Sequence, residues 1–420
     1  MACPARSFVG VEGRRAARAP AASSEQGASR TGKVFLNLRK EQPMRILFTA
    51  CPFFGHVNTV LPLALAAQRA GHEVAVATGA DFGEHIARRG LTAWSVGPTS
   101  VEAGTPSSPA YFWHTASQRA VDLLPLAAAW GPDLIVSEEL EFAGAIAAAR
   151  GDSRHVVHGL GIAAAGDWEM FAASIDELGR QWDVPDLADA HRGAVYLSIC
   201  PPTLQPPTRS ERRASERRVQ PLRPGVGEPA PGERLPEALM ALPYERTLHL
   251  TLGTVFHQRR PGVLEAAIAG LRELPVNLVV TVGPDVAPDR FGSQPPHVLV
   301  ERYLPHALLL PRCDLVVSQG GAGILLGTLA HGLPQLVLPQ GADQFDNGAA
   351  AQRAGVALTL DDSVVTPLAI TEAVGQLLGD PRYAAAARAV QKEIDTMPSA
   401  DDVLTSMIAG PAPRASRSAW

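Results

Sequence analysis

Short apolar runs alternate with amphipathic segments along most of the chain. In the first half, the expected strands are 45–49, 73–77, 92–96, 134–136 and 156–157. The expected helices between them are 59–70, 81–89 and 142–150. Strands that alternate with helices of roughly 10 to 15 residues are typical of βαβ units. The first half is therefore expected to form one α/β domain with a parallel sheet.

This alternation stops near residue 201 and resumes near residue 246. Residues 201–236 contain many prolines and the charged run 209–213, and they lack a periodic apolar face. They are expected to form a linker or a surface loop rather than a cationic recognition patch. The later elements are the strands 247–252, 277–282, 298–300, 315–317 and 335–338 and the helices 261–274, 324–331 and 381–396. The pattern predicts a first domain at 44–202, a linker region at 203–245 and a second domain at 246–410.

A glycine-rich turn in the second half joins an expected strand to an expected helix. The turn consists of Gly320, Gly321, Ala322 and Gly323. Backbone N–H groups at such a helix start favour an anion, usually a phosphate. A tight turn without a ligand is the alternative. The next strand ends at a polar run that contains Asp343, Gln344 and Asn347, at the sheet edge where open α/β folds bind ligands. Together the two loops favour a nucleotide-sugar.

Composition narrows the class of protein. The 420 residues are 46% hydrophobic and 19% charged, enough for two globular domains with their own cores. A net charge of −5 gives no electrostatic case for nucleic acid or an anionic membrane surface. No apolar run approaches the roughly 18 residues that a membrane span needs. Cys3, Cys51, Cys200 and Cys313 lack the spacing of metal ligands and are expected to be reduced, mostly buried thiols of a cytoplasmic protein.

The first 43 residues differ from the rest of the chain. They are rich in Ala, Arg, Ser and Gly and contain no apolar segment of the kind that directs secretion. Residues 1–43 are expected to be a disordered extension. Met44, which opens the first apolar run, is interpreted as the natural start of the folded region.

The stretch 313–358 resembles the donor-binding signature of the nucleotide-sugar-dependent glycosyltransferases of the GT-B fold. It is most similar to bacterial enzymes that attach deoxysugars to antibiotics. The resemblance implies two Rossmann-like parallel-sheet domains that face a cleft. Two positions depart from the family pattern, which usually has His in place of Gln319 and Thr or Ser in place of Ile324. The two departures predict weak binding of the nucleotide diphosphate, and replacing both by the family residues is expected to strengthen it.

The resemblance implies a set of residues that bind the sugar donor. In the family, the loop at Gly253 and Thr254 approaches the diphosphate, the segment at Tyr303 receives the nucleobase, and Asp343 with Gln344 binds the hexose. The complete set is Gly253, Thr254, Tyr303, Gln319, Gly320, Gly321, Ala322, Gly323, Asp343 and Gln344. For Gly253, Thr254 and Tyr303, a purely structural role in packing or in a turn is the alternative. No metal and no further cofactor are expected, because in the family the helix start and side chains neutralise the diphosphate.

The loop Gly55-His56-Val57-Asn58 matches the catalytic loop of the family. An alcohol is a poor nucleophile until its proton is removed, and histidine titrates near neutrality. The resemblance therefore implies that His56 is the general base; a helix-capping or solvent-facing histidine is the alternative. Glu138 stands where the family has an aspartate and is expected to orient His56. Alternatively, Glu138 and Glu139 are ordinary loop charges.

Aromatic residues in the first domain are candidates for contacts with the acceptor. They fall in segments that are expected to be irregular, and ordinary core packing is the alternative. The candidates are Phe53, Phe54, the segment Tyr111-Phe112-Trp113-His114, Trp168 and Phe171, with Phe53, Phe54, Trp113 and Trp168 preferred.

These features predict an inverting glycosyltransferase. It would move a hexose or deoxyhexose from a dTDP- or UDP-sugar to a hydroxyl of a natural-product aglycone such as a polyketide. Its partners would be these small molecules, and a homodimer is compatible with this interpretation. The alternative is a non-catalytic homologue that acts as a binding or auxiliary partner. A nicotinamide dehydrogenase is disfavoured because Leu326 breaks the G-x-G-x-x-G pattern.

Overall fold

The computed structural model describes residues 43–104, 110–162, 171–205, 218–225, 227–253, 262–284 and 286–408. Several predicted features lie outside these residues. They are the extension 1–43 except Pro43, the charged run 209–213, Cys3, Trp168 and Thr254.

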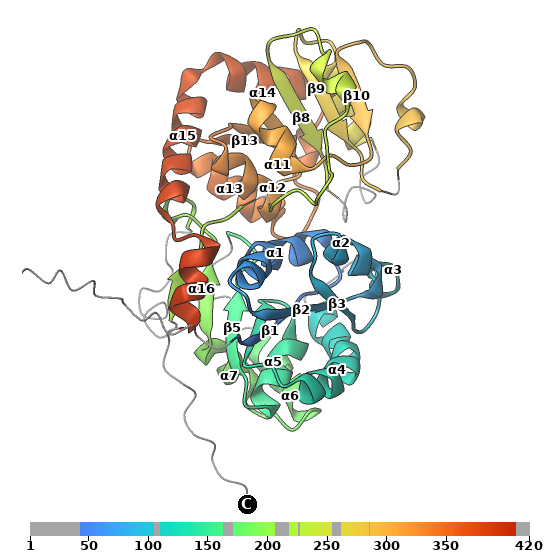
Figure 1. The fold of residues 1–420 in the computed structure, drawn as a ribbon. Helices are drawn as coiled ribbons and strands as arrows, with labels where there is room; N and C mark the ends of the chain where they lie inside the picture. The colour runs from blue at the N-terminus through green and yellow to red at the C-terminus, as the bar shows by residue number, and fades with distance from the viewer. Residues whose placement is uncertain are drawn as a thin grey trace, which may run out of the picture. The chain divides into compact units, whose positions relative to one another are not determined.

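The first sheet has seven parallel strands in the order β3-β2-β1-β4-β5-β6-β7. Figure 1 labels β1, β2, β3 and β5 of this sheet. The strands are β1 Arg45–Thr49, β2 Glu73–Thr78, β3 Thr92–Ser95, β4 Leu134–Glu138, β5 Arg154–His158, β6 Val195–Ser198 and β7 Val219–Pro221. Strand β7 lies inside the segment predicted to be a linker, and it pairs with β6. The linker prediction failed there because a three-residue edge strand is too short to show alternation.

Helices cover both faces of the first sheet. They are α1 Phe54–Arg69, α2 Gly83–Ala87, α3 Ser100–Ala103, α4 Ala110–Trp130, α5 Phe142–Arg150, α6 Ala172–Arg180 and α7 Leu187–Gly193. Alternate residues of β1 face opposite layers: Ile46 packs in the cluster that contains α1, and Leu47 packs in the cluster that contains α4 and α5. This alternation is the ordinary geometry of a strand that is buried on both faces.

Two helices of the first half differ from the prediction. Helix α1 begins at Phe54 rather than at residue 59, so His56 lies in its first turn and not on a loop. Residues 111–114 were expected to be irregular but belong to α4, a helix of 21 residues. The aromatic cluster at its start and Pro125 inside it obscure the helical period, and packing against α5 and α6 stabilises the helix despite the proline.

The second sheet has six parallel strands in the order β10-β9-β8-β11-β12-β13. The strands are β8 Thr247–Thr251, β9 Asn277–Thr281, β10 Val298–Glu301, β11 Leu315–Ser318, β12 Gln335–Val337 and β13 Ala357–Thr359. The associated helices are α9 Glu237–Met240, α10 Val263–Leu271, α11 His306–Leu309, α12 Ala322–Ala330, α13 Gln344–Arg353, α14 Pro367–Gly379, α15 Pro381–Thr396 and α16 Ala400–Ile408. The strand order reverses at β1 in the first sheet and at β8 in the second, which are the points where such sheets bind ligands.

The last helix returns to the first sheet. Helix α15 has the predicted bounds, but the sequence did not reveal α16, which packs against α1. Val403 and Leu404 of α16 are buried in the same cluster as the apolar face of α1. The Arg223 guanidinium donates to the carbonyl groups of Asp395 (2.7 Å) and Met397 (3.1 Å) and so holds the end of α15.

Two expectations from composition can be compared with the described residues. No helix among them is long and apolar enough to cross a membrane. Cys51, Cys200 and Cys313 are buried and form no disulfide, as predicted.

Candidate active site

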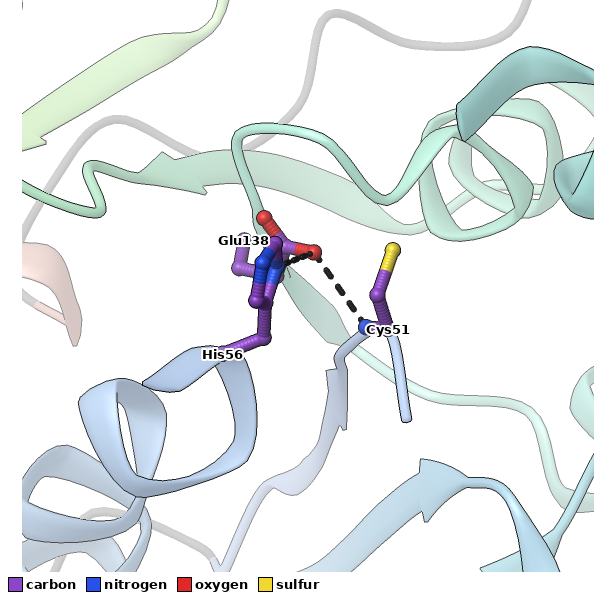
Figure 2. A group of neighbouring side chains, drawn as sticks. All are labelled: Cys51, His56 and Glu138. Atoms are coloured by element: carbon purple, nitrogen blue, oxygen red, sulfur yellow. Dashed lines mark hydrogen bonds and ion pairs between the residues drawn. The ribbon is translucent and has the colours of Figure 1, made fainter. Parts of the chain in front are cut away.

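His56 and Glu138 meet because their strands are neighbours (Figure 2). Strand β1 leads into the first turn of α1, which carries His56, and Glu138 is the last residue of the adjacent strand β4. The His56 Nδ1 and Glu138 Oε1 atoms are 2.8 Å apart. The imidazole is 17% exposed and the carboxylate is fully buried. The hydrogen bond to Glu138 thus fixes the Nδ1 edge of the imidazole, and another part of the ring still reaches solvent.

The carboxylate of Glu138 is held by backbone as well as by His56. The Cys51 N–H donates to its Oε1 (3.2 Å) and the Leu140 N–H donates to its Oε2 (2.7 Å). Burial alone would raise the pKa of Glu138, but the charge of His56 and these hydrogen bonds outweigh it and lower the pKa. The carboxylate is therefore ionised and suited to accept a hydrogen bond from the Nδ1–H group of His56.

Glu139 faces a different part of the first sheet. Its carboxylate accepts hydrogen bonds from the Tyr196 hydroxyl (2.8 Å) and the Leu160 N–H (3.0 Å). Of the two adjacent glutamates, only Glu138 contacts His56. Glu139 instead connects the ends of β4, β5 and β6.

Aromatic rings surround His56. Its ring is stacked on Phe112 with centroids 5.8 Å apart, and Phe53 lies 5.4 Å away. Tyr111 packs against Phe53 at 5.8 Å. Phe53 and Phe112 therefore lie beside the histidine, and Tyr111 packs on Phe53. All three are among the aromatic acceptor candidates, although α4, which carries Tyr111 and Phe112, was not expected to be a helix.

The other acceptor candidates lie elsewhere in the first half. Phe54 packs edge-on against Phe82, with centroids 4.9 Å apart. Trp113 packs against Phe171 and lines a cavity of about 410 Å³ between α4 and α6, together with Ser117 and Arg180. Neither Phe54 nor Trp113 joins the rings around His56.

Cys51, His56 and Glu138 also have to be considered as metal ligands. Their ligand atoms lie within 4.8 Å of one another, and no other group of this kind occurs in the described part of the chain. However, burial raises the pKa of the Cys51 thiol well above its usual value. A thiol must lose its proton to bind a metal, and Glu138 Oε1 already accepts two hydrogen bonds. The three groups fit a proton-transfer site better than a cation site.

The glycine loop of the second half opens α12 as predicted. Gly321 is the N-cap, Ala322 begins the helix and Gly323 is exposed in its first turn. Gly320 and Gly253 both have positive φ, +82° and +73°, a backbone conformation that favours glycine. The first-turn N–H groups of α12 are free of intrahelical partners, so the loop can hold an anion.

Gln319 lies between the loops that follow β8 and β11. A Cβ atom added at Gly253 would be 2.4 Å from Gln319 Nε2, and one added at Gly321 would be 2.8 Å from it. The glycines therefore leave the space that the carboxamide occupies. Ile324 points elsewhere: it is 8% exposed and packs with Leu310 and Val316. The expectation that a hydroxyl at 324 would reach the diphosphate is not supported, because this side chain belongs to an apolar cluster.

Asp343 and Gln344 lie at the start of α13, beside the glycine loop. The Asn347 amide donates to Asp343 Oδ2 (2.8 Å) and to the Gly320 carbonyl (3.0 Å), which ties the two loops together. Asp343 keeps an exposed surface although protein atoms crowd around it, and this crowding raises the pKa of its carboxyl. Gln344 Oε1 accepts from the N–H groups of Gln340 and Gly341, so its NH₂ group is the part left for a ligand.

The segment after β10 contains Tyr303 and His306. Tyr303 is 54% exposed and its hydroxyl lies 3.5 Å from Glu233. His306 begins α11, and its Nε2 is 3.3 Å from Nε2 of the buried His249. The Nδ1–H of His249 donates to the Val279 carbonyl (3.0 Å), so His306 Nε2 must be the donor in this pair. No local pattern marks this pair, which is separated by 57 residues.

Comparisons with known proteins agree with this geometry. Residues 265–409 match the family model of the erythromycin biosynthesis protein CIII-like C-terminal domain. The L-demethylnoviosyl transferase of Streptomyces niveus is 31% identical over 372 residues, which cover 83% of this chain and 94% of that protein. The elloramycin glycosyltransferase ElmGT of Streptomyces olivaceus is 30% identical, with 86% and 96% covered.

A solved structure gives the same result for the fold. The spinosyn rhamnosyltransferase SpnG, complexed with spinosyn aglycone, superposes with a TM-score of 0.73 at 26% identity and covers 87% of this chain and 100% of that one. The prediction of two parallel-sheet α/β domains of the GT-B type is confirmed. The chain belongs to the GT-B antibiotic glycosyltransferases and is a nucleotide-sugar-dependent hexosyltransferase.

Proposed function

We propose that this protein is an inverting glycosyltransferase that moves a deoxyhexose from a dTDP- or UDP-sugar to a hydroxyl of a polyketide-like aglycone. The observation that carries the proposal is the 2.8 Å contact between His56 Nδ1 and the buried Glu138 carboxylate. A carboxylate in this position keeps the proton on Nδ1 and leaves the lone pair on Nε2. The ring can then act as a base toward solvent, where an acceptor would bind.

The reaction is a single displacement. The Nε2 atom of His56 takes the proton of the acceptor hydroxyl while its oxygen attacks the anomeric carbon of the donor. A new C–O bond forms on the face opposite the diphosphate, and the bond to the diphosphate breaks with its electron pair leaving on oxygen. The proton stays on the imidazole, and Glu138 stabilises the resulting cation.

The second sheet supplies the groups for the sugar donor. The N–H groups at the start of α12 and the helix dipole favour an anion, so we infer that they bind the diphosphate. Asp343 and the NH₂ group of Gln344 are proposed to bind hexose hydroxyls. We expect the reaction to need no added divalent cation, because these groups stabilise the leaving diphosphate.

The first sheet supplies an apolar surface for the acceptor. Phe53, Tyr111 and Phe112 lie around His56 and present ring faces and edges. Such a surface favours a large apolar acceptor with few charges. The structurally similar SpnG has been solved in complex with spinosyn aglycone, which supports an aglycone as the acceptor.

Replacing His56 by alanine tests the proposal. We expect His56→Ala to lower kcat by about 10²–10⁴-fold, the usual contribution of a general base, while dTDP still raises the melting temperature. His297→Ala is a matched control, because His297 contacts the Arg272 carbonyl and the Tyr244 ring, which do not belong to the proposed site. Near-normal turnover in His56→Ala would show that another group is the base. If the native protein binds dTDP but neither transfers nor hydrolyses a sugar donor, the auxiliary role is the correct one.

A further inference from the structure

Arg119 and Glu141 form a buried ion pair close to the turn that follows Glu138. The Arg119 Nε atom donates to Glu141 Oε1 at 2.9 Å, and both side chains are 1% exposed. In the described part of the chain, no other ion pair has both side chains buried to this degree. Replacing a buried ion pair by apolar residues of similar volume is often neutral or stabilising, so stability alone does not account for such a pair.

Glu141 fixes the turn that carries Glu138. Its backbone N–H donates to the Glu138 carbonyl (3.0 Å). Its carboxylate caps α5, accepting the N–H groups of Ala143 (3.0 Å) and Gly144 (2.7 Å). The turn from Glu138 to Glu141 is therefore held at both ends, and it includes the Leu140 N–H that bonds the catalytic carboxylate.

Arg119 fixes the part of α4 that packs on His56. Its guanidinium donates to the Thr115 hydroxyl (3.0 Å) and the Phe112 carbonyl (3.5 Å). The Thr115 hydroxyl in turn donates to the Tyr111 carbonyl (2.8 Å). These bonds hold the first turns of α4, which carry the ring of Phe112 that stacks on His56.

We propose that the Arg119–Glu141 ion pair positions His56 for proton transfer. The pair joins the two structures that contact the imidazole, namely the turn with its carboxylate partner and the helix with its aromatic wall. Arg119 and Glu141 are positioning residues, because neither contacts His56 itself in the structure. Charged partners suit this role because the N–H donors of the planar guanidinium have fixed directions, so they bond the carboxylate in only a narrow range of geometries. This proposal rests on the proposed role of His56 as the base.

The test removes both charges at once. Arg119→Met alone would leave Glu141 buried without its partner and would strongly destabilise the fold, so the main variant is Arg119→Met with Glu141→Gln. The glutamine oxygen can still cap α5. We expect kcat to fall on the order of 10²-fold, as for a catalytic group displaced by about an ångström. The KM for the sugar donor should stay the same, because the second sheet is unchanged.

The control is a variant of the same domain with a matched loss of melting temperature. Ile175→Ala in α6 is suitable, because Ile175 is 1% exposed and packs in the same apolar cluster as Phe112 but takes no part in the Arg119–Glu141 ion pair. This variant is expected to keep kcat within about twofold of the parent. If the double variant does the same, the proposal is overturned. A general loss of stability would lower kcat in both variants, and that result would also overturn it.

A spectroscopic measurement separates this proposal from the base role of His56. In ¹H NMR of histidine-labelled protein, the Nδ1 proton bonded to Glu138 should give a downfield resonance that His56→Ala removes. We expect the resonance to persist in Ile175→Ala and to broaden or disappear in the double variant. A lowered kcat with an unchanged resonance would overturn positioning through His56. The resonance does not depend on turnover, so it still tests positioning if His56 proves not to be the base.

Discussion

Replacing Gln319 by histidine tests how the diphosphate is bound. Gln319 lies beside Gly253 and Gly321, and its Oε1 is buried without a hydrogen-bond partner in the described structure. Its NH₂ group can donate a neutral hydrogen bond to a phosphate oxygen. A protonated histidine at this position would donate a charge-assisted bond, which is about twice as strong.

The expected gain in dTDP affinity is the difference between a neutral and a charge-assisted hydrogen bond. A neutral hydrogen bond contributes about 0.5–1.5 kcal/mol net and a charged one about 1.5–3 kcal/mol. Gln319→His should therefore strengthen dTDP binding by about 1–2 kcal/mol, which is about 5- to 30-fold in Kd. The gain should be larger at pH 6 than at pH 8, because only the protonated imidazole carries charge.

Calorimetric titration with dTDP at the two pH values measures this effect. Gln319→Leu is the control that removes the hydrogen bond, and it should weaken binding. Ile324→Thr separates position 319 from position 324. Because Ile324 packs with Leu310 and Val316, this change should cost about 1–2 kcal/mol of stability and leave dTDP affinity unchanged. The reasoning is refuted if Ile324→Thr tightens binding, or if Gln319→His does not tighten it at pH 6.

Two further predictions concern stability. A Cβ atom at Gly144 would lie 2.3 Å from Thr49 Oγ1 and 3.0 Å from the Ser137 Cβ. Gly144→Ala should therefore lower the free energy of unfolding by about 1–3 kcal/mol, as measured by urea unfolding. An unchanged urea midpoint would contradict the packing described. Burial lowers the pKa of His249 to about 3 and of His306 to about 4, whereas the unfolded value is about 6.5. The folded state therefore binds fewer protons, and the stability present above pH 6.5 should be lost as pH falls toward 4, by at most about 1.4 kcal/mol per pH unit for each histidine. Urea unfolding at pH 7.5 and pH 5 checks this, and His306→Gln should flatten the dependence; a slope unaffected by that change would exclude the pair as its source.

Much of the fold was determined by local patterns in the sequence. The bounds of α5 and α15 were predicted to the residue, because each helix is delimited by neighbours in the chain. Asp380 caps α15 and Pro381 occupies its first position, while Gly151 ends α5. The apolar strands were found for the same reason, since burial on both faces leaves a continuous apolar run. The glycine loop at α12 was also readable, because positive φ at Gly320 demands glycine.

The tertiary structure decided which residues meet at the site. Glu138 and Glu139 are adjacent, but Glu138 ends β4 and Glu139 begins the turn after it, so their carboxylates have different partners. The family resemblance pointed to Glu138, and the strand order, with β4 beside β1, explains physically why its carboxylate contacts His56. Likewise, Ile324 matches a family position for a hydroxyl, yet packing around α12 turns it toward apolar neighbours. The Arg119–Glu141 pair joins a residue of α4 to the N-cap of α5, and its closeness follows from the packing of α4 on α5, which no local pattern encodes.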